Sequence, residues 1–302
     1  MFNLQENIKK VNLEKLLAKN TDKIDSLKNV FGDKTRFDIY DDYDIFLKVN
    51  KIVYDDKRKY PRYEKDHLVQ HAFSVLKEIR QKLFLEQIES YCDVGCGWGN
   101  FPRAAYEHGA KSSLGIDIKQ RPIWEDYARG TDGRVVYKNE DISHKEHGLG
   151  KYKLVTSFAA FEHFDTPGAM LKAMSSLVED DGYLYIKFSP IYNSSDGFHM
   201  YRHIHIPWYH LLFSESVCKR FYNENGLEEL VNVNYLNKWS AFDFMVLFGN
   251  FTDLKLISLS PLWNFNHYWF SKTFPAVLPC LGIEELMISG FEVVFKNIAN
   301  TM

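Results

Sequence analysis

A glycine-rich turn at residues 90–99 constrains the fold of this 302-residue chain more than any other feature of its sequence. The stretch reads SYCDVGCGWG, so an apolar run leads into glycines at positions 95, 97 and 99. Glycines at alternate positions allow a ligand to approach the backbone where a Cβ atom would collide. A helix that begins near Gly99 would add free N–H groups. The pattern therefore predicts a strand, a ligand-binding turn and a helix in succession.

The acid before this turn distinguishes it from a dinucleotide-binding turn. Dinucleotide-binding sequences read G-x-G-x-x-G, whereas here Asp93 precedes glycines spaced as G-x-G-x-G. A carboxylate at that position would repel a pyrophosphate, and it suits a cationic ligand. The spacing therefore disfavours a nicotinamide dinucleotide as the ligand.

Strand-like and helix-like segments alternate between residues 90 and 190, which is typical of a parallel sheet. Two further strands are expected closer to the C-terminus. Together they predict an α/β, Rossmann-like fold with a seven-stranded, mostly parallel sheet. The expected strands span residues 90–95, 113–117, 134–137, 153–158, 182–188, 253–260 and 291–296, and the expected helices span 64–86, 99–108, 121–129 and 166–178.

Two more acids follow expected strands. Asp117 ends the second strand, where a carboxylate can accept hydrogen bonds from both hydroxyls of a ribose. Asp141 comes just after the third strand. Because open α/β sheets bind ligands at the carboxyl ends of their strands, the glycine turn and both acids are expected at one edge of the sheet.

With these motifs the chain resembles the class I S-adenosylmethionine-dependent methyltransferases, whose cofactor carries an ammonium and a sulfonium and no phosphate. The resemblance implies that Asp93 and the glycine turn hold the methionine part, while Asp141 and Ile142 contact the adenine. It also implies that Phe158 and Ala159 line the pocket near the methyl group. The candidate cofactor-binding residues are Asp93, Gly95, Cys96, Gly97, Gly99, Asp117, Ile118, Asp141, Ile142, Phe158 and Ala159.

Composition argues against several other functions. The chain has 37 basic and 40 acidic residues, a net charge of −3, so a dedicated nucleic-acid binder is not expected. None of the four cysteines forms a C-x-x-C pair, which disfavours disulfides or structural zinc and favours a reducing compartment. No stretch approaches the ~20 apolar residues needed to span a bilayer. We therefore expect a soluble, cytoplasmic protein without membrane insertion.

Residues 1–88 are expected to form a helical N-terminal cap, because apolar residues recur at helical spacing from Leu4 to Leu27 and again over 64–86. The first helices could pack on the main domain or form a homodimer contact. Residues 89–302 are expected to form the methyltransferase domain. Its segments at about 190–245 and 261–288 are too long and too aromatic for simple connections, so we expect them to be acceptor-binding insertions.

The segment 189–215 follows the fifth expected strand and is rich in His, Tyr, Trp, Arg, Asn and Ser, whose side chains hydrogen-bond sugars and phosphates. Methyl transfer to a hydroxyl requires removal of its proton, and imidazole is a suitable general base near neutral pH. His199 is the first candidate for this base. His203, His205 and His163 are the other candidates.

The histidines at 199, 203, 205 and 210 also raise the alternative of a divalent metal that binds and acidifies neighbouring hydroxyls. Hard metal ions prefer carboxylates, and only Asp196 and Glu215 lie nearby in the sequence. No metal ligand is therefore assigned. Purely structural or substrate-binding roles for these histidines remain a third alternative.

A Ser-Pro opening, a loop histidine and the run IPWYHLLF at 206–213 resemble methyltransferases found with bacterial surface-glycan genes. The resemblance implies O-methylation of a sugar, a phosphorylated or nucleotide-linked sugar, or a phosphoramidate intermediate in capsule or lipopolysaccharide synthesis. The expected partner is a small-molecule or glycan-linked acceptor. Two alternatives are a lipid-modifying enzyme, since GCGWG also occurs in cyclopropane fatty acid synthases, and a catalytically silent methyltransferase-like binding subunit.

Overall fold

The computed structural model describes residues 4–32, 37–54, 65–143, 148–233 and 236–298. The chain divides into two compact units, each with its own apolar core. The sheet unit comprises Pro61–Phe188, Met245–Ser260 and Phe291–Met302, and the helical unit comprises Met1–Tyr60, Ser189–Phe244 and Pro261–Gly290.

These units divide the chain differently from the boundary expected at residue 88. The helix α5 (Lys65–Lys82) belongs to the sheet unit, whereas the residues before 61 join the two segments expected as insertions. Leu27 and Phe46 are buried in one apolar cluster with Trp208 and Phe270. Apolar periodicity reveals which face of a helix is buried, but it does not reveal which segment covers that face.

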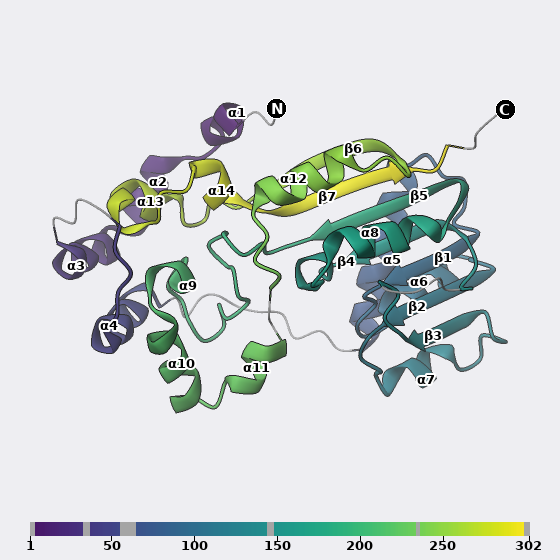
Figure 1. The fold of residues 1–302 in the computed structure, drawn as a ribbon, viewed down its shortest axis with the longest axis horizontal. Helices are drawn as coiled ribbons and strands as arrows, with labels where there is room; N and C mark the ends of the chain where they lie inside the picture. The colour runs from purple at the N-terminus through teal and green to yellow at the C-terminus, as the bar shows by residue number, and fades with distance from the viewer. Residues whose placement is uncertain (1–3, 33–36, 55–64, 144–147, 234–235, 299–302) are drawn as a thin grey trace. The chain divides into compact units, whose positions relative to one another are not determined.

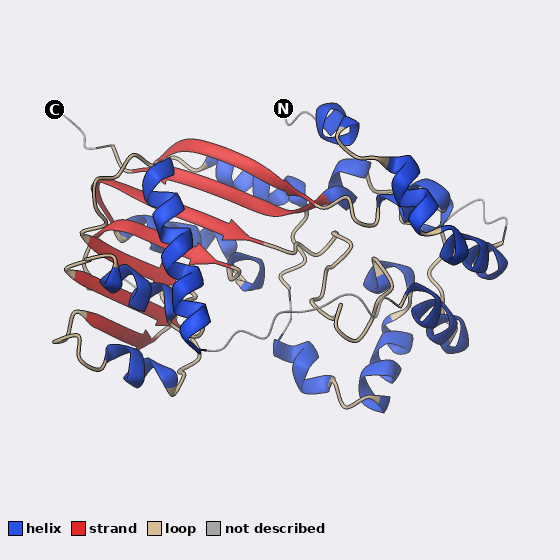
Figure 2. Cartoon of the chain, turned by 180° about the vertical axis from the view of Figure 1, so that it is seen from behind, coloured by secondary structure: helices blue, strands red, loops and turns tan. Residues whose placement is uncertain are grey.

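In the described ranges, seven strands form one sheet in the order β3-β2-β1-β4-β5-β7-β6 (Figures 1 and 2). β1 to β5 are parallel, and β7 runs antiparallel to β5. The predicted seven-stranded, mostly parallel Rossmann-like sheet is thereby confirmed. The strands are β1 (Ser90–Val94), β2 (Ser112–Asp117), β3 (Val135–Asn139), β4 (Tyr152–Phe158), β5 (Val178–Phe188), β6 (Lys255–Trp263) and β7 (Ile288–Lys296).

Helices cover both faces of this sheet. α5 and α6 lie on one face and α8 on the other (Figures 1 and 2). Tyr91 and Leu154 are fully buried beneath the first layer, and on the other side the Phe248 ring packs against Phe161 and Phe188. The other helices are α6 (Asn100–Glu107), α7 (Ile123–Ala128), the 3-10 helix η1 (Phe161–His163), α8 (Pro167–Ser176) and α12 (Ala241–Asn250), which begins in the helical unit.

The helical unit joins distant parts of the sequence. The Tyr40 N–H donates to the Leu212 carbonyl (2.8 Å), and the Ser214 N–H donates to the Tyr40 carbonyl (2.9 Å). These two bonds tie the N-terminal part of the chain to the end of the histidine-rich segment 189–215, which is called the histidine-rich loop below. Its helices are α1 (Leu4–Lys9), α2 (Leu13–Lys19), α3 (Thr21–Phe31), α4 (Tyr43–Val53), α9 (Tyr209–Leu212), α10 (Glu215–Glu224), α11 (Glu228–Val233), α13 (Tyr268–Thr273), η2 (Pro275–Val277) and α14 (Ile283–Met287).

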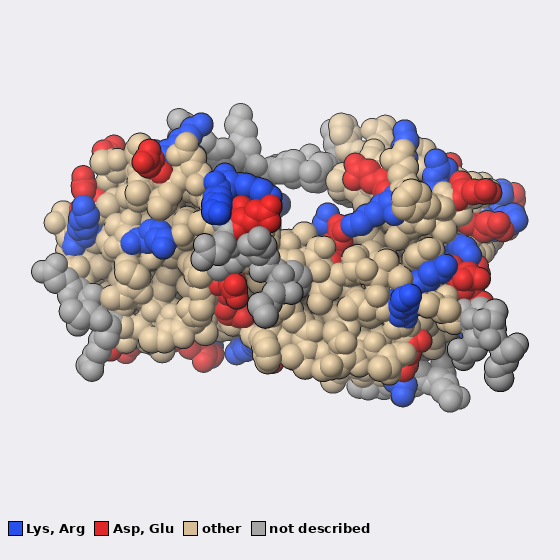
Figure 3. Space-filling model, turned by 90° about the horizontal axis from the view of Figure 1, so that it is seen from above, with Lys and Arg blue, Asp and Glu red and all other residues tan. Residues whose placement is uncertain are grey.

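Two surface properties bear on function. Among the described residues, no helix combines the length and apolar character that crossing a membrane would require. On the face drawn in Figure 3, basic and acidic side chains are intermixed.

Candidate functional site

The glycine turn after β1 adopts a backbone that requires glycine. Gly95, Gly97 and Gly99 have φ angles of +75°, +50° and +81°. A Cβ atom on Gly95 would lie 2.4 Å from the Ala160 Cβ, and one on Gly99 would lie 2.6 Å from the Tyr137 ring. A Cβ on Gly97 would meet nothing within 4 Å, so the middle of the turn opens onto free space. The turn therefore excludes side chains at Gly95 and Gly99 and is accessible at Gly97.

Asp93 is a buried acid at the end of β1. Its side chain is 1% exposed, and its Oδ1 atom accepts a hydrogen bond from the Thr156 hydroxyl at 2.7 Å. Burial raises the pKa of Asp93 to about 8, because the charged form loses its hydration. A cation bound beside this carboxyl would offset that cost, which fits the ammonium of an amino-acid ligand.

Asp117 holds the glycine turn from the end of β2. Its Oδ2 atom accepts a hydrogen bond from the Gly97 N–H, and its Oδ1 atom accepts one from the Lys119 N–H, each at 2.8 Å. A carboxylate oxygen has a second lone pair, so both oxygens can still accept from ligand hydroxyls. This arrangement fits the predicted ribose contact.

The turn is also held by two aromatic residues. The Trp124 indole N–H donates to the Gly97 carbonyl (3.0 Å), and the Tyr137 hydroxyl donates to the Gly99 carbonyl (2.6 Å). The Trp124 and Tyr137 rings stack, with centroids 5.3 Å apart and planes 14° apart. Both carbonyls thus have donors within the protein. The turn's own N–H groups are also engaged: Gly95 and Cys96 donate to the Ile116 carbonyl, and Gly97 and Gly99 donate to Asp117 and Cys96. The turn therefore has its shape before any ligand binds.

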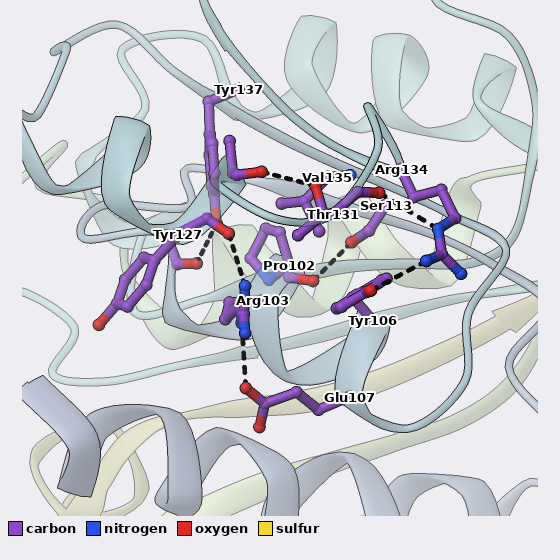
Figure 4. Close-up of polar contacts among 12 residues, drawn as sticks. Pro102, Arg103, Tyr106, Glu107, Ser113, Tyr127, Thr131, Arg134, Val135 and Tyr137 are labelled. Atoms are coloured by element: carbon purple, nitrogen blue, oxygen red, sulfur yellow. Dashed lines mark hydrogen bonds and ion pairs between the residues drawn. The ribbon is translucent and has the colours of Figure 1, made fainter.

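A polar network fixes helix α6, which begins after the turn (Figure 4). The Arg103 guanidinium donates to the Tyr127 carbonyl and to the Glu107 carboxylate, both at 3.0 Å. Arg134 donates to the Tyr106 hydroxyl at 3.0 Å. These contacts join α6 to α7 and to the start of β3, so the helix N-terminus beside the turn is rigidly placed.

The cofactor candidate Ile118 and the two residues predicted near the adenine, Asp141 and Ile142, differ in exposure. Ile118 is 75% exposed, whereas the Ile142 side chain is 1% exposed. Asp141 is exposed, and its Oδ1 atom accepts hydrogen bonds from the Ser143 N–H (2.8 Å) and hydroxyl (2.7 Å). The two isoleucines therefore differ in availability: Ile118 offers a side chain to a ligand, and Ile142 offers only its backbone.

The residues predicted near the methyl group follow β4. The Phe158 ring stacks on Phe101, with centroids 4.0 Å apart. Ala159 is exposed and has a φ of +46°, a strained conformation for a residue other than glycine. His163 ends η1 and is half-buried. Strain of this kind is characteristic of functional sites, so the position after β4 agrees with a role in binding.

The histidine-rich loop of the helical unit shapes a cavity of about 260 Å³. His199 lines it, with its backbone at a φ of +54° directly after Phe198 at +75°. Two consecutive non-glycine residues with positive φ angles are uncommon. Backbone strain of this kind is found mainly at functional positions. The other lining residues are Ser189, Pro190, Asp196, Tyr201, Asn264 and Ser289.

The other two loop histidines do not line this cavity. His203 is exposed, and its carbonyl accepts a hydrogen bond from Asn50 (3.4 Å). The His205 N–H donates to the Asn50 Oδ1 atom (2.7 Å), and its ring packs edge-on against Tyr54. His205 instead borders a separate cavity of about 10 Å³ beside His267, which is about the size of one water molecule. The structure thus separates His199 from its two neighbours.

A family model described as a methyltransferase domain matches residues 68–239, more than half of the chain. The chain belongs to this methyltransferase family. The matched range contains the glycine turn, Asp117, Asp141 and the histidine-rich loop. The match confirms the predicted enzyme class and, with it, the cofactor S-adenosylmethionine.

Two curated relatives match shorter ranges of the methyltransferase domain. Sphingolipid C9-methyltransferase 2 of Gibberella zeae is 27% identical over 126 residues, 38% of this chain and 24% of that protein. Ubiquinone biosynthesis O-methyltransferase of Shewanella pealeana is 31% identical over 98 residues, 31% of this chain and 40% of that protein. The chain therefore spans between 24% and 40% of the length of these relatives, and their acceptors are not carried over to it.

Solved structures with similar folds have low sequence identity. Magnesium protoporphyrin IX methyltransferase of Synechocystis PCC 6803, with bound SAH, is 13% identical with a TM-score of 0.42, covering 95% of this chain and all of that one. The PH0226 protein of Pyrococcus horikoshii is 11% identical with a TM-score of 0.46, covering 80% of this chain and 97% of that one.

Within the methyltransferase domain, the predicted cofactor residues gather in the sheet unit, at or just after the carboxyl ends of β1 to β4. His163 lies in the same unit, whereas His199, His203 and His205 lie in the helical unit. The sequence did not single out Trp124 and Tyr137 as supports of the turn. The available indication in the sequence was that Trp124 and Tyr137 each combine an aromatic ring with a hydrogen-bond donor and lie in the two elements that follow Asp117.

Sequence reasoning also missed the polar partners in the cavity. Asn264 donates from its Nδ2 atom to the Asp196 Oδ2 atom at 3.0 Å. Asn264 belongs to the aromatic segment 261–288, in which Tyr268, Trp269 and Phe270 are buried in the core of the helical unit. A polar residue among these aromatics was the available signal, although Asn266 and His267 share it.

Proposed function

We propose that this methyltransferase transfers a methyl group to a hydroxyl of a small polar acceptor, with His199 as the general base. The acceptor class that we favour is a sugar, or a phosphorylated or nucleotide-linked sugar or phosphoramidate intermediate, of capsule or lipopolysaccharide synthesis. The observation that carries this proposal is the cavity of about 260 Å³, whose lining combines His199 with Asp196 and Asn264.

The cofactor half of the proposal rests on the sheet unit. S-adenosylmethionine, when bound, supplies an electrophilic methyl group on a sulfonium. In the proposal the buried Asp93 carboxylate binds the ammonium, the Asp117 carboxylate accepts hydrogen bonds from the ribose hydroxyls, and the glycine turn lets the ligand approach the backbone closely. The raised pKa of Asp93 and the open space at Gly97 support this assignment. The holding residues align the methyl group for transfer, which lowers the entropic barrier.

The acceptor half requires a base. Transfer of a methyl cation to a neutral hydroxyl forms an ether and releases one proton, which a neutral imidazole can take up. His199 is supported by its place in the cavity and by its strained backbone. In the same cavity Asp196 is held by the Asn264 amide, and its carboxylate has further lone pairs that can accept hydrogen bonds from neighbouring hydroxyl groups of an acceptor.

A lipid-modifying reaction is the second candidate, and the match to a sphingolipid C9-methyltransferase favours it. A lipid acceptor would need an apolar channel for its chain. The cavity beside His199 has mainly polar side chains, and its volume of about 260 Å³ suits a compact polar molecule better. We therefore rank the sugar acceptor first.

Two experiments test the proposal. The first is calorimetry with S-adenosylhomocysteine, where absence of binding would support the catalytically silent alternative. The second incubates the protein with S-adenosylmethionine and panels of nucleotide sugars, capsule fragments and sphingolipids, read by mass spectrometry. A methylated sugar is expected, and a methylated lipid alone would overturn the acceptor assignment.

The base is tested by His199→Gln, which is expected to bind S-adenosylhomocysteine normally and to lose turnover by at least about a hundredfold, the usual range for a general base. Arg202→Gln is the matched control, since this side chain is exposed on the same loop. Normal turnover of the His199 variant would show that another group removes the proton.

A further inference from the structure

The ring of His210, at the start of α9, is fixed by a hydrogen bond to the loop that carries His199. Its Nε2 atom lies 2.6 Å from the Tyr192 carbonyl oxygen. Burial lowers the pKa of His210 to about 4, so the ring is neutral near pH 7. Because a carbonyl oxygen only accepts, the single N–H must be on Nε2 and must point at Tyr192. His210 is therefore a donor to the loop and a poor general base.

Gly197 packs directly onto this hydrogen bond. A Cβ atom at position 197 would lie 2.2 Å from the Tyr192 carbonyl oxygen and 2.7 Å from both Cε1 and Nε2 of His210. No side chain fits there without moving the ring or the carbonyl. Glycine is thus required at position 197, because its Cα lies against the Tyr192 carbonyl and the His210 ring. The chain turns at Gly197 while in contact with this hydrogen-bonded pair.

The two strained residues follow immediately. Phe198 and His199 have φ angles of +75° and +54°. The Phe198 ring lies 6.0 Å from the His210 ring and 6.1 Å from the Tyr192 ring, centroid to centroid. Such backbone conformations persist only where the surroundings enforce them. Here the enforcing groups are the ring beneath Gly197 and the aromatic contacts of Phe198.

We propose that His210 is a positioning residue for His199: its Nε2–H holds the Tyr192 carbonyl beneath Gly197, and this fixed turn directs the His199 ring into the cavity. The inference rests on the proposed role of His199 as base. It adds a residue that never touches the acceptor but decides where the base lies. A displacement of the base by about 1 Å is enough to lower turnover by about a hundredfold.

Two substitutions distinguish the effect of the His210 hydrogen bond from the effect of the packing of its ring. His210→Gln places an amide N–H near the position of Nε2 and so keeps the donor, whereas His210→Phe keeps a ring and removes the donor. Both are expected to bind S-adenosylhomocysteine with unchanged affinity. Gly197→Ala is the third variant, because it displaces the same pair without altering His210.

The first readout needs no acceptor. In protein with ¹³C-labelled histidine, the His199 Cε1–H signal is assigned from His199→Gln and followed by NMR from pH 5 to 8. His210→Phe and Gly197→Ala are expected to displace this signal and its titration midpoint, and His210→Gln is expected to leave both near the wild-type values. A purely structural role would lower the melting temperature of all three variants without changing the His199 signal, and that result would overturn the proposal.

Turnover of the acceptor found by mass spectrometry is the second readout. His210→Phe is expected to lower kcat about a hundredfold with little change in KM, and His210→Gln to restore kcat to within about threefold of wild type. Wild-type kcat in His210→Phe together with an inactive His199→Gln would overturn the positioning role alone. An active His199→Gln would overturn the proposed base and the positioning role together, so the two failures are distinguishable.

Discussion

The Asp117 carboxylate accepts a hydrogen bond from the Gly97 N–H at 2.8 Å, so the acid that ends β2 is bound to the turn that follows β1. Two motifs that are separate in the sequence therefore form one rigid structure. A ligand that hydrogen-bonds to the Asp117 carboxylate would therefore lie beside both the end of β2 and the turn after β1. The arrangement makes Asp117 both a support of the turn and a candidate ligand contact.

Replacement of Asp117 by Asn should weaken cofactor binding more than the loss of one ligand contact would. Each carboxylate oxygen now accepts a hydrogen bond from one backbone N–H, that of Gly97 or that of Lys119. In the Asn variant the NH₂ group would replace one of these oxygens, so a donor would face a donor. We expect S-adenosylhomocysteine affinity to fall by about a hundredfold, as when a charged hydrogen bond is lost. Calorimetry measures it. Asp180→Asn, an exposed acid on β5, is the control and should bind normally.

Binding of S-adenosylhomocysteine near neutral pH should release a proton from Asp93. Burial raises the pKa of this carboxyl to about 8, so the group is mostly protonated at pH 7 in the free protein. An ammonium bound beside it favours the charged form and lowers that pKa, so a proton leaves on binding. At pH 9 the group is already ionised, and no release is expected.

Proton release is measured by calorimetry at pH 7 in buffers of different ionisation enthalpy. The observed binding enthalpy should vary with the buffer for the wild type and should not vary for Asp93→Asn. A buffer-independent enthalpy for the wild-type protein would show that Asp93 does not change its protonation when the cofactor binds.

The raised pKa of Asp93 also predicts how stability depends on pH. In the unfolded chain this carboxyl ionises near its ordinary value of 3.8, whereas in the folded protein it stays protonated up to about pH 8. The folded state therefore holds the extra proton between these values, and the contribution of Asp93 to stability falls as pH rises through that window. Chemical unfolding from pH 5 to 8 should show this decline in the wild type and a smaller one in Asp93→Asn.

Gly99→Ala should destabilise the protein more than Gly130→Ala. Both glycines have positive φ angles, +81° and +72°, so both substitutions have the same backbone cost of about 1 kcal/mol. Only at Gly99 would the new Cβ also collide, at 2.6 Å from Tyr137 and 2.9 Å from Trp124. We expect an additional loss of about 1–3 kcal/mol from this overpacking, measured by urea unfolding. Equal losses would mean that the two rings move aside freely.

Asn264→Leu should raise the KM for the acceptor with little effect on cofactor affinity. The substitution removes the donor that faces Asp196 at 3.0 Å and lines the cavity with a group of similar size. Loss of this intramolecular hydrogen bond, of a kind that contributes about 1.5–3 kcal/mol, releases the Asp196 carboxylate from its place in the cavity, so we expect the KM to rise by about tenfold. Steady-state kinetics with the identified acceptor measure it, and an unchanged KM would place the acceptor elsewhere.

Local patterns predicted the sheet well, because they are properties of short segments. Strand and helix periodicities over 90–190 located β1 to β4 to within a few residues. They also located the end of β5, although this strand begins earlier than expected. The boundary of the N-terminal cap was less predictable. The helices α3 and α4 bury Leu27 and Phe46 in a cluster that also contains Trp208 and Phe270, and no periodicity encodes a partner so distant in the chain.

The sequence by itself determined the methyltransferase fold and indicated which residues share one edge of the sheet, because the glycine turn, Asp93 and Asp117 are recognised by their spacing along consecutive strands. Only the tertiary structure separated four similar histidines into one that lines the cavity, one that is exposed, one beside a smaller cavity and one, His210, that donates to the Tyr192 carbonyl. All four have the same side chain within a stretch of 12 residues, from 199 to 210. Their roles differ because burial, backbone conformation and hydrogen-bond partners come from segments far away in the chain.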